Sequence, residues 1–337
     1  MSILLDGRLK VSVFGESHAA GIGALIEGFP AGQKVDFDAL AADMARRKAS
    51  LSAYSTKRIE PDEVEFVCGV KDGVTTGAAI CLLIRNTNTR SGDYADFHRV
   101  PRPSHADYPA HIKYGGFEDY RGGGQFSGRL TAPMVAAGNL AKQWLSERGV
   151  SVCAKIARIA GLPAKDGELT PEIFKKIEQV AAEKDSCGGV IEGRISGLPV
   201  GLGAPMAGSV ESRLASLLYA VPAVKAVSFG LGFGFAEGFG KEVNDAYTVK
   251  EGKIVPATNR NGGVLGGLTT GADVTFAAAF KPVPSIAAEQ DSVDLETLQP
   301  VKLAIKGRHD VCVVPRAVPV VEGVAALGTL DLVLEGR

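Results

Sequence analysis

The amino-acid sequence predicts an α+β fold in which strands and helices share a single domain, residues 1–337. Short apolar segments, alternating or continuous, are typical of strands, and longer segments carry apolar residues at helical spacing. The chain contains no Pro/Ser-rich bridge, low-complexity tract or block of like charge that would mark a linker. We therefore expect one domain with long functional loops.

The first third of the chain predicts a strand-rich start, a helix and then a long loop. The expected elements are strands over 8–14 and 22–27, a helix over 37–48, and a hairpin of 63–70 with 78–85. Asp36 is a candidate N-cap for the helix. Residues 86–124 show little periodicity, and they hold three of the five histidines and most of the tyrosines. An aperiodic stretch of this length inside a domain is usually functional.

The remainder predicts alternating helices and strands. The expected elements are a helix over 127–148 opening directly after Gly122–Gly124, a strand over 151–160, a helix from Pro171 capped by Thr170, strands over 189–197 and 225–233, a helix over 209–220, a strand over 272–280 and a helix over 316–335. The alternating glycines and apolar residues of 231–240 also favour a strand.

One short sequence occurs twice. Gly-Val-Thr-Thr-Gly-Ala at 73–78 recurs as Gly-Leu-Thr-Thr-Gly-Ala at 267–272, and each copy leads into an apolar strand that ends in a cation. A match over only six positions is compatible with chance and with duplication of an ancestral segment. Duplication would predict two related halves that pack their helices together between two sheets.

The bulk composition excludes several classes of protein. The net charge is −1, with 37 Lys+Arg against 38 Asp+Glu, which argues against a general nucleic-acid or membrane-surface binder. The five scattered cysteines form no CxxC pair, so neither a disulfide framework nor a metal cluster is predicted. The N-terminus lacks the pattern of a signal peptide, and we expect no segment to approach a membrane span. These features indicate a cytoplasmic protein with reduced thiols.

Two histidines are candidate functional residues. His18 ends a Gly-Glu-Ser-His turn directly after a strand, where a side chain can project into a cleft; the alternative is a surface or structural histidine. His105 lies in Arg-Pro-Ser-His-Ala-Asp-Tyr at 102–108, where a neighbouring carboxylate could orient the ring or hold its proton, as general acid catalysis requires.

Glycine-rich turns and cations indicate a site for a small anion. Gly122–Gly124, running into a helix, would present free backbone N–H groups, and Gly262–Gly267 is a second such turn. The nearby cations are Arg121, Arg129, Lys281 and Arg308. Gly-Arg-His-Asp at 307–310 sets Asp310 beside an arginine and a histidine, which makes a proton relay feasible.

Motifs in matching order over about 310 residues resemble the chorismate synthase family. They are Gly15–His18, Asp43–Lys48, Arg58–Asp62, Arg102–Tyr108, Asp119–Gly124, Ala223–Lys225, Gly262–Gly267 and Gly307–Cys312 through Arg316–Pro319. The resemblance implies a β-α-β sandwich, with helices between two antiparallel sheets, assembled as a homotetramer. It implies conversion of 5-enolpyruvylshikimate 3-phosphate to chorismate and phosphate, with reduced FMN required and no net redox change.

The resemblance also implies roles for individual residues. His18 would protonate the leaving phosphate, His105 would protonate reduced flavin, and Asp310 would help to move the substrate proton. The implied FMN-binding residues are Gln125, Phe126, Ser127, Ala223, Gly266, Lys281, Pro282, Val283, Pro284, Ser285 and Arg308. Arg47 matches a position associated with substrate or NADPH, and Arg129 is a further candidate for the anion.

The chain departs from the family beside the expected flavin site. Many relatives read Arg-Ser-Ser-Ala-Arg-Glu-Thr where this chain reads Gln-Phe-Ser-Gly-Arg-Leu-Thr at 125–131, and Ala53 stands where a second arginine is common. Two other readings therefore stay open: a flavin- or nucleotide-binding relative with weak or no turnover, and a serine hydrolase that uses Ser17. NADPH and an external flavin reductase both remain candidate sources of reduced flavin.

Overall fold

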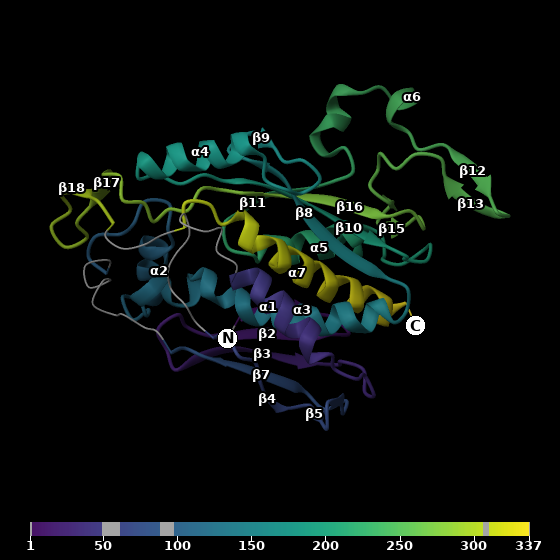
Figure 1. Ribbon diagram of the computed structural model, residues 1–337, viewed down its shortest axis with the longest axis horizontal. Coiled ribbons are helices and arrows are strands. Elements are labelled where there is room, and N and C mark those ends of the chain that lie inside the picture. Colours follow the sequence, from purple (N-terminus) through teal and green to yellow (C-terminus); the bar gives the residue numbers. More distant parts are fainter. Residues whose placement is uncertain (1, 49–60, 88–97, 306–309, 337) are drawn as a thin grey trace.

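Two five-stranded antiparallel sheets enclose a layer of helices in the computed structural model, which describes residues 2–48, 61–87, 98–305 and 310–336 (Figure 1). The first sheet has the order β1-β2-β3-β7-β4, with strands Ser2–Asp6, Lys10–Gly15, Gly21–Glu27, Ile80–Arg85 and Glu65–Cys68. The second has the order β11-β16-β10-β8-β9, with strands Val224–Phe229, Val274–Phe280, Gly189–Ser196, Ser151–Ile159 and Leu162–Pro163. The α+β sandwich implied by the resemblance is therefore confirmed.

The middle layer contains four helices, α1 (Phe37–Lys48), α3 (Thr131–Ser146), α5 (Val210–Tyr219) and α7 (Val314–Glu335). The long helices α3 and α7 pack on each other; α3 faces β3 and β7, and α7 faces β8 and β10. Both are buried over most of their surface, as expected for helices that are apolar on nearly every side. Two caps predicted from the sequence are confirmed, because Asp36 accepts a hydrogen bond from Ala39 N and Thr170 one from Ile173 N.

Helix α7 is long and apolar enough to cross a membrane by length and composition alone, with a hydropathy of 1.8 over an 18-residue window. The expectation that no segment approaches a membrane span overlooked this helix. Its surroundings explain the composition, because 89% of that window is buried inside the protein. The helix is therefore a core element packed between two sheets.

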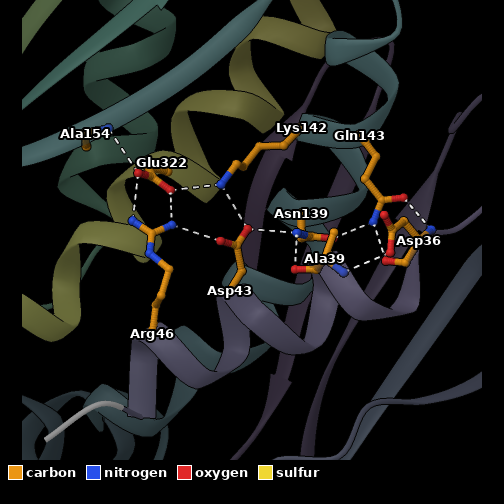
Figure 2. Close-up of polar contacts among 9 residues, drawn as sticks. All are labelled: Asp36, Ala39, Asp43, Arg46, Asn139, Lys142, Gln143, Ala154 and Glu322. Atoms are coloured by element: carbon orange, nitrogen blue, oxygen red, sulfur yellow. Dashed lines mark hydrogen bonds and ion pairs between the residues drawn. The ribbon is translucent and has the colours of Figure 1, made fainter.

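A network of charged side chains crosses this apolar layer and joins α1, α3 and α7 (Figure 2). Glu322 of α7 accepts hydrogen bonds from both terminal nitrogens of Arg46, at 2.7 and 2.9 Å, and from Lys142 Nζ at 2.9 Å. Asp43 of α1 accepts from Arg46, Lys142 and Asn139 at 2.8–2.9 Å. Each buried carboxylate is thus paired and hydrogen-bonded, which fixes the end of α1 that carries Arg47.

The remaining elements are three helices, several 3-10 turns and four short strand pairs, counted over the described residues. They are α2 (Asp107–Tyr114), α4 (Pro171–Ala182), α6 (Gly240–Val243), the 3-10 turns η3 (Arg121–Phe126), η4 (Gly128–Leu130), η5 (Met206–Gly208) and η6 (Gly232–Glu237), and the two-stranded pairs β5/β6 (Val70–Lys71, Val74–Thr75), β12/β13 (Tyr247–Lys250, Lys253–Pro256), β14/β15 (Val264–Leu265, Leu268–Thr269) and β17/β18 (Gln290–Val293, Pro300–Leu303).

Three expectations from the sequence are wrong in detail. The 86–124 stretch contains α2 and most of η3, because its helical segments are too short to show a period. The helix expected from 127 begins at Thr131, since Ser127 instead caps the 3-10 turn η4 with its side chain. The strand expected over 231–240 is replaced by η6 and the start of α6.

Candidate active site

The two predicted catalytic histidines lie against one turn, built from consecutive glycines of η3. A Cβ on Gly122 would lie 2.2 Å from Cε1 of His18, and a Cβ on Gly123 would lie 3.2 Å from Nε2 of His105. Both glycines also have positive φ, 58° and 83°, which an L side chain rarely adopts. The structure therefore brings His18 and His105 together and explains why the turn between them is made of glycine.

The His18 turn is fixed by backbone contacts to its neighbours. The N–H of Ser17 donates to Gly124 O at 3.2 Å, which ties the turn to η3. From the end of β7, Asn86 Nδ2 donates to the carbonyls of Glu16 at 3.0 Å and Ala19 at 2.8 Å. The His18 side chain is only 9% exposed, so the imidazole is held in a largely dehydrated site.

His105 lies beside a buried ion pair. Its Nδ1 is 2.5 Å from Asp107 Oδ1, and Asp107 also accepts from Arg102 Nε and Nη2, both at 2.8 Å. Burial alone would raise the pKa of Asp107, but its contacts with Arg102 and His105 outweigh this and hold the pKa well below its usual range. Asp107 is therefore ionised at neutral pH and supplies a fixed negative charge to the histidine.

Two predicted anion-binding arginines share one carboxylate, Asp62. Arg47 Nη2 donates to Asp62 Oδ2 at 2.5 Å, and Arg129 Nη1 donates to Oδ1. All three residues are at most 8% exposed. Burial lowers the pKa of Arg47 to about 10, although Asp62 opposes the shift. With two guanidinium groups against one carboxylate, the cluster keeps a net positive charge in a low-dielectric site.

One arginine of α7 joins Asp310 to this cluster. Arg316 Nη1 donates to Asp310 Oδ2 at 2.6 Å, and its Nε donates to the carbonyl of Arg47 at 3.1 Å. Arg129 in turn donates through Nε to Asn86 Oδ1 at 3.0 Å, and Asn86 holds the His18 turn. A continuous polar network therefore runs from Asp310 to the His18 turn, although the residues along it are far apart in the sequence.

Comparison with known proteins identifies the family of this chain. The family model described as chorismate synthase matches residues 9–334. A chorismate synthase of Pyrococcus abyssi is 44% identical over 350 residues, covering 99% of this chain and 98% of that protein. One of Chitinophaga pinensis is 45% identical over 329 residues, covering 97% and 96%. The chain belongs to the chorismate synthase family.

A solved structure supports the same assignment. The crystal structure of a chorismate synthase superposes with a TM-score of 0.75 at 26% identity, covering 97% of this chain and 92% of that one. Membership of the chorismate synthase family makes this chain an enzyme, a lyase that acts on a small molecule.

Several residues that the family resemblance assigns to FMN lie near the two histidines or follow directly on residues that do. Lys281 N donates to Ala223 O at 2.9 Å, and Lys281 Nζ donates to the carbonyl of Ser104, next to His105. Ser285 Oγ accepts from Arg102 Nη1 at 3.3 Å. The segment between them comprises Pro282, Val283 and Pro284, and Gln125, Phe126 and Ser127 follow the glycine turn.

Gly266 is not shown beside the other cofactor residues. Gly266 lies in the β14/β15 hairpin, next to the start of β16, whereas Lys281 follows the end of that strand. The seven residues of β16 span roughly 20 Å. Arg308 lies outside the described residues. The expectation that Gly122–Gly124 opens a long helix is also wrong, because these glycines form a kinked turn and α3 begins at Thr131.

Sequence reasoning missed three residues that organise the site: Asp62, Asn86 and Arg316. Asp62 and Arg316 lie inside motifs that resemble the family, but a charge pattern alone does not show that two arginines distant in sequence meet one carboxylate. Asn86 directly follows the predicted strand that ends at Arg85. Its position at a strand end was the available signal for a functional side chain.

Proposed function

We propose that this chain catalyses the anti-1,4-elimination of phosphate from 5-enolpyruvylshikimate 3-phosphate to give chorismate, using reduced FMN without net redox change. The C–O bond to phosphate breaks with its electron pair, a ring C–H bond breaks with loss of a proton, and a diene forms. The observation that supports it is the joint placement of His18 and His105 on one glycine turn, linked to a buried cationic cluster.

The arginine cluster matches the charge of this substrate. Two carboxylates and a phosphate monoester carry about −3.5 to −4 at neutral pH. Arg47 Nε is a buried donor without a hydrogen-bond partner among the described residues. A buried donor of this kind is costly until an acceptor arrives, so Arg47 and Arg129 are suited to bind the anion.

The histidines and Asp310 are proposed to move protons. His18 donates a proton to the leaving phosphate, which removes the cost of expelling a more highly charged anion from a dehydrated site. His105 holds a proton at the cofactor side of the glycine turn. Asp310, held by Arg316, assists removal of the ring proton. When bound, reduced flavin supplies electron density to phosphate loss and recovers it afterwards.

The residues present fit a flavin phosphate. Burial, and then the neighbouring charge of Lys225, lower the pKa of Lys281. An anion between these two lysines would relieve their repulsion. FMN is therefore proposed to bind the Lys281–Ser285 segment together with Gln125–Ser127 and Ala223.

The proposal extends to the domain organisation, cellular location, electron supply and assembly of the chain. The whole chain acts as one catalytic domain in the cytoplasm, and NADPH or an external flavin reductase supplies the electrons that keep FMN reduced. A homotetramer is favoured because Gly266 lies away from the other cofactor residues of its own chain and would contribute to the site of a second copy.

The other readings have less support. Ser17 is 1% exposed and is followed by β3 rather than by a helix, so it lacks the geometry of a hydrolase nucleophile. A flavin binder without turnover would not need both histidines to face one glycine turn.

An anaerobic phosphate-release assay tests the proposal. Purified protein with chemically reduced FMN should release phosphate from the enolpyruvyl substrate, and His18→Ala and Asp310→Ala should each slow turnover more than they weaken FMN binding. Repeating the assay with oxidised FMN and NADPH shows whether the chain reduces its own flavin. Absence of phosphate release from the unmodified protein with reduced FMN would refute the function. A variant that loses FMN binding but keeps its rate at saturation would refute only that residue's role.

A further inference from the structure

The contacts of His105 Nδ1 favour one tautomer of the ring. Nδ1 lies 2.5 Å from Asp107 Oδ1 and 3.0 Å from Arg102 Nη2. An ionised carboxylate only accepts hydrogen bonds and a guanidinium only donates them. If Nδ1 carried its lone pair, that lone pair would face a carboxylate oxygen at 2.5 Å, which is strongly repulsive. The guanidinium would favour a lone pair on Nδ1, but Arg102 Nη2 lies farther away than the carboxylate and already donates to Asp107 Oδ1 at 2.8 Å. The shorter carboxylate contact therefore decides, and Nδ1 carries the hydrogen and donates it to Asp107.

Asp107 is itself fixed by three contacts from Arg102. The backbone N–H and Nε of Arg102 donate to Oδ2 at 2.9 and 2.8 Å, and Nη2 donates to Oδ1 at 2.8 Å. The Arg102 and Asp107 side chains are only 4% and 5% exposed. Arg102 Nη1 extends to Ser285 Oγ at 3.3 Å. The carboxylate that faces His105 is thus held from the segment proposed to bind the cofactor.

With Nδ1 committed to Asp107, the other ring nitrogen is the one left for chemistry. Nε2 faces Gly123, where a Cβ would lie 3.2 Å away. The opposite tautomer would already carry its hydrogen on Nε2, so Nε2 could not take up the proton that it passes on. It would also leave the Asp107 charge without its imidazole partner. A carboxylate that orients a catalytic histidine is worth several powers of ten in turnover in enzymes built this way.

We propose that Asp107, held by Arg102, is a positioning residue that fixes the proton of His105 on Nδ1, so that Nε2 is the atom that exchanges a proton during the reaction. The group with which Nε2 exchanges its proton rests on the proposed function. The tautomer of His105 does not depend on turnover, so the tautomer and the proposed function can be tested separately.

NMR of the unmodified protein with ¹⁵N-labelled histidine tests the tautomer directly. Two-bond nitrogen–proton correlations distinguish Nδ1–H from Nε2–H, and loss of a signal set in His105→Asn assigns the residue. We expect neutral His105 to carry its proton on Nδ1. Finding it on Nε2 would overturn the proposal, whether or not the protein releases phosphate.

Asp107→Asn tests the consequence for catalysis. The amide offers one acceptor instead of two and a donor that opposes Nδ1–H, so the tautomers should mix and kcat should fall by about 10²–10⁴, with KM unchanged. Asp107→Glu restores the negative charge and should recover the Nδ1–H signal and part of kcat. If Asp107→Asn folds poorly, this second variant still tests the role of the carboxylate. An unchanged kcat in a folded Asp107→Asn variant with mixed tautomers contradicts the positioning role.

The chain offers a matched control in a second histidine–carboxylate pair near the same helix. His111 Nδ1 lies 3.3 Å from Glu118 Oε1, and neither residue has a role in the proposed reaction. Glu118→Gln should leave both kcat and the His105 tautomer as they are in the unmodified protein. An equal loss of kcat in Glu118→Gln would show that any disturbance near α2 suffices, and the specific role of Asp107 would be rejected.

Discussion

Thr75 and Thr269 make the same pair of hydrogen bonds in two halves of the molecule. Thr75 Oγ1 donates to Pro30 O at 2.8 Å and accepts from Gln33 N at 2.9 Å. Thr269 Oγ1 donates to the carbonyl of Pro199 at 2.6 Å and accepts from the N–H of Leu202 at 2.9 Å. Both pairs span a proline and the residue three positions later. The recurrence of residues 73–78 at 267–272 therefore reflects equivalent structure.

The equivalence extends over both sheets. Strands β2-β3-β7-β4 of the first sheet have the same order as β8-β10-β16-β11 of the second, and in each half a helix follows the second strand and a long helix ends the unit. The loops around the two prolines read Gly-Phe-Pro-Ala-Gly at 28–32 and Gly-Leu-Pro-Val-Gly at 197–201. This agreement favours duplication over chance.

Replacing either threonine by valine should destabilise the protein to a similar extent. Valine keeps the shape of threonine but leaves one buried carbonyl and one buried N–H without a partner, at a cost of about 1–3 kcal/mol per variant. Thr75 and Thr269 are 3% and 2% exposed, so water does not replace the lost bonds. Urea unfolding measures the change, with Thr76→Val as the control. A loss in Thr75→Val without a comparable loss in Thr269→Val would contradict their equivalence.

Gly138→Ala should destabilise the interface of α3 with α7. A Cβ there would lie 2.2 Å from the Cα of Gly323, and backbone atoms of α7 cannot yield as a flexible side chain would. Such overpacking costs about 1–3 kcal/mol or more. The control is Gly240→Ala, where the nearest atom to the new Cβ is an Asn244 side-chain nitrogen at 3.8 Å. Thermal unfolding that shows equal stability for both variants would contradict the close helix contact.

The Glu322 network should make stability depend on pH. Burial raises the pKa of Glu322, but hydrogen bonds and charges from Arg46 and Lys142 outweigh it, so the net shift is downward from 4.5. A lowered folded-state pKa stabilises the protein above the unfolded pKa, and this stability is lost as pH falls through the folded value. Urea unfolding should show the free energy of unfolding decreasing below about pH 4.5.

Glu322→Gln isolates this contribution. The variant should lose about 1–3 kcal/mol at neutral pH, because Arg46 and Lys142 keep only Asp43 as an anionic partner. It should also show a shallower loss of stability on acidification than the unmodified protein. The control is Glu65→Gln, whose partner Arg85 is exposed. Parallel pH curves for Glu322→Gln and the unmodified protein would remove Glu322 as a source of the pH dependence.

The sequence predicted the layers of this fold better than its connections. Periodicity identified the main helices and strands because each buries one face or its whole surface, and family motifs identified His18 and His105. The pairing of Arg47 and Arg129 through Asp62 was not predictable, since segments 67 residues apart meet only in the folded chain. The short helix α2 was not predicted, because its eight residues make only about two helical turns, too few to show a clear apolar periodicity.

Gly122→Ala should reduce turnover far more than it reduces stability. The new methyl group would lie 2.2 Å from Cε1 and 2.3 Å from Nδ1 of His18, so the imidazole must leave its place against the turn. A displaced proton donor should lower kcat by roughly 10² or more.

Gly115→Ala is the matched control, because its φ of 63° resembles the 58° of Gly122 while its Cβ would meet only Phe117 Cδ2, at 3.9 Å. Both variants carry a similar left-handed backbone penalty of about 1–2 kcal/mol, visible in urea unfolding. The two variants should therefore have similar free energies of unfolding but different rates of phosphate release. Equal rates in the two variants would show that His18 does not depend on the glycine turn.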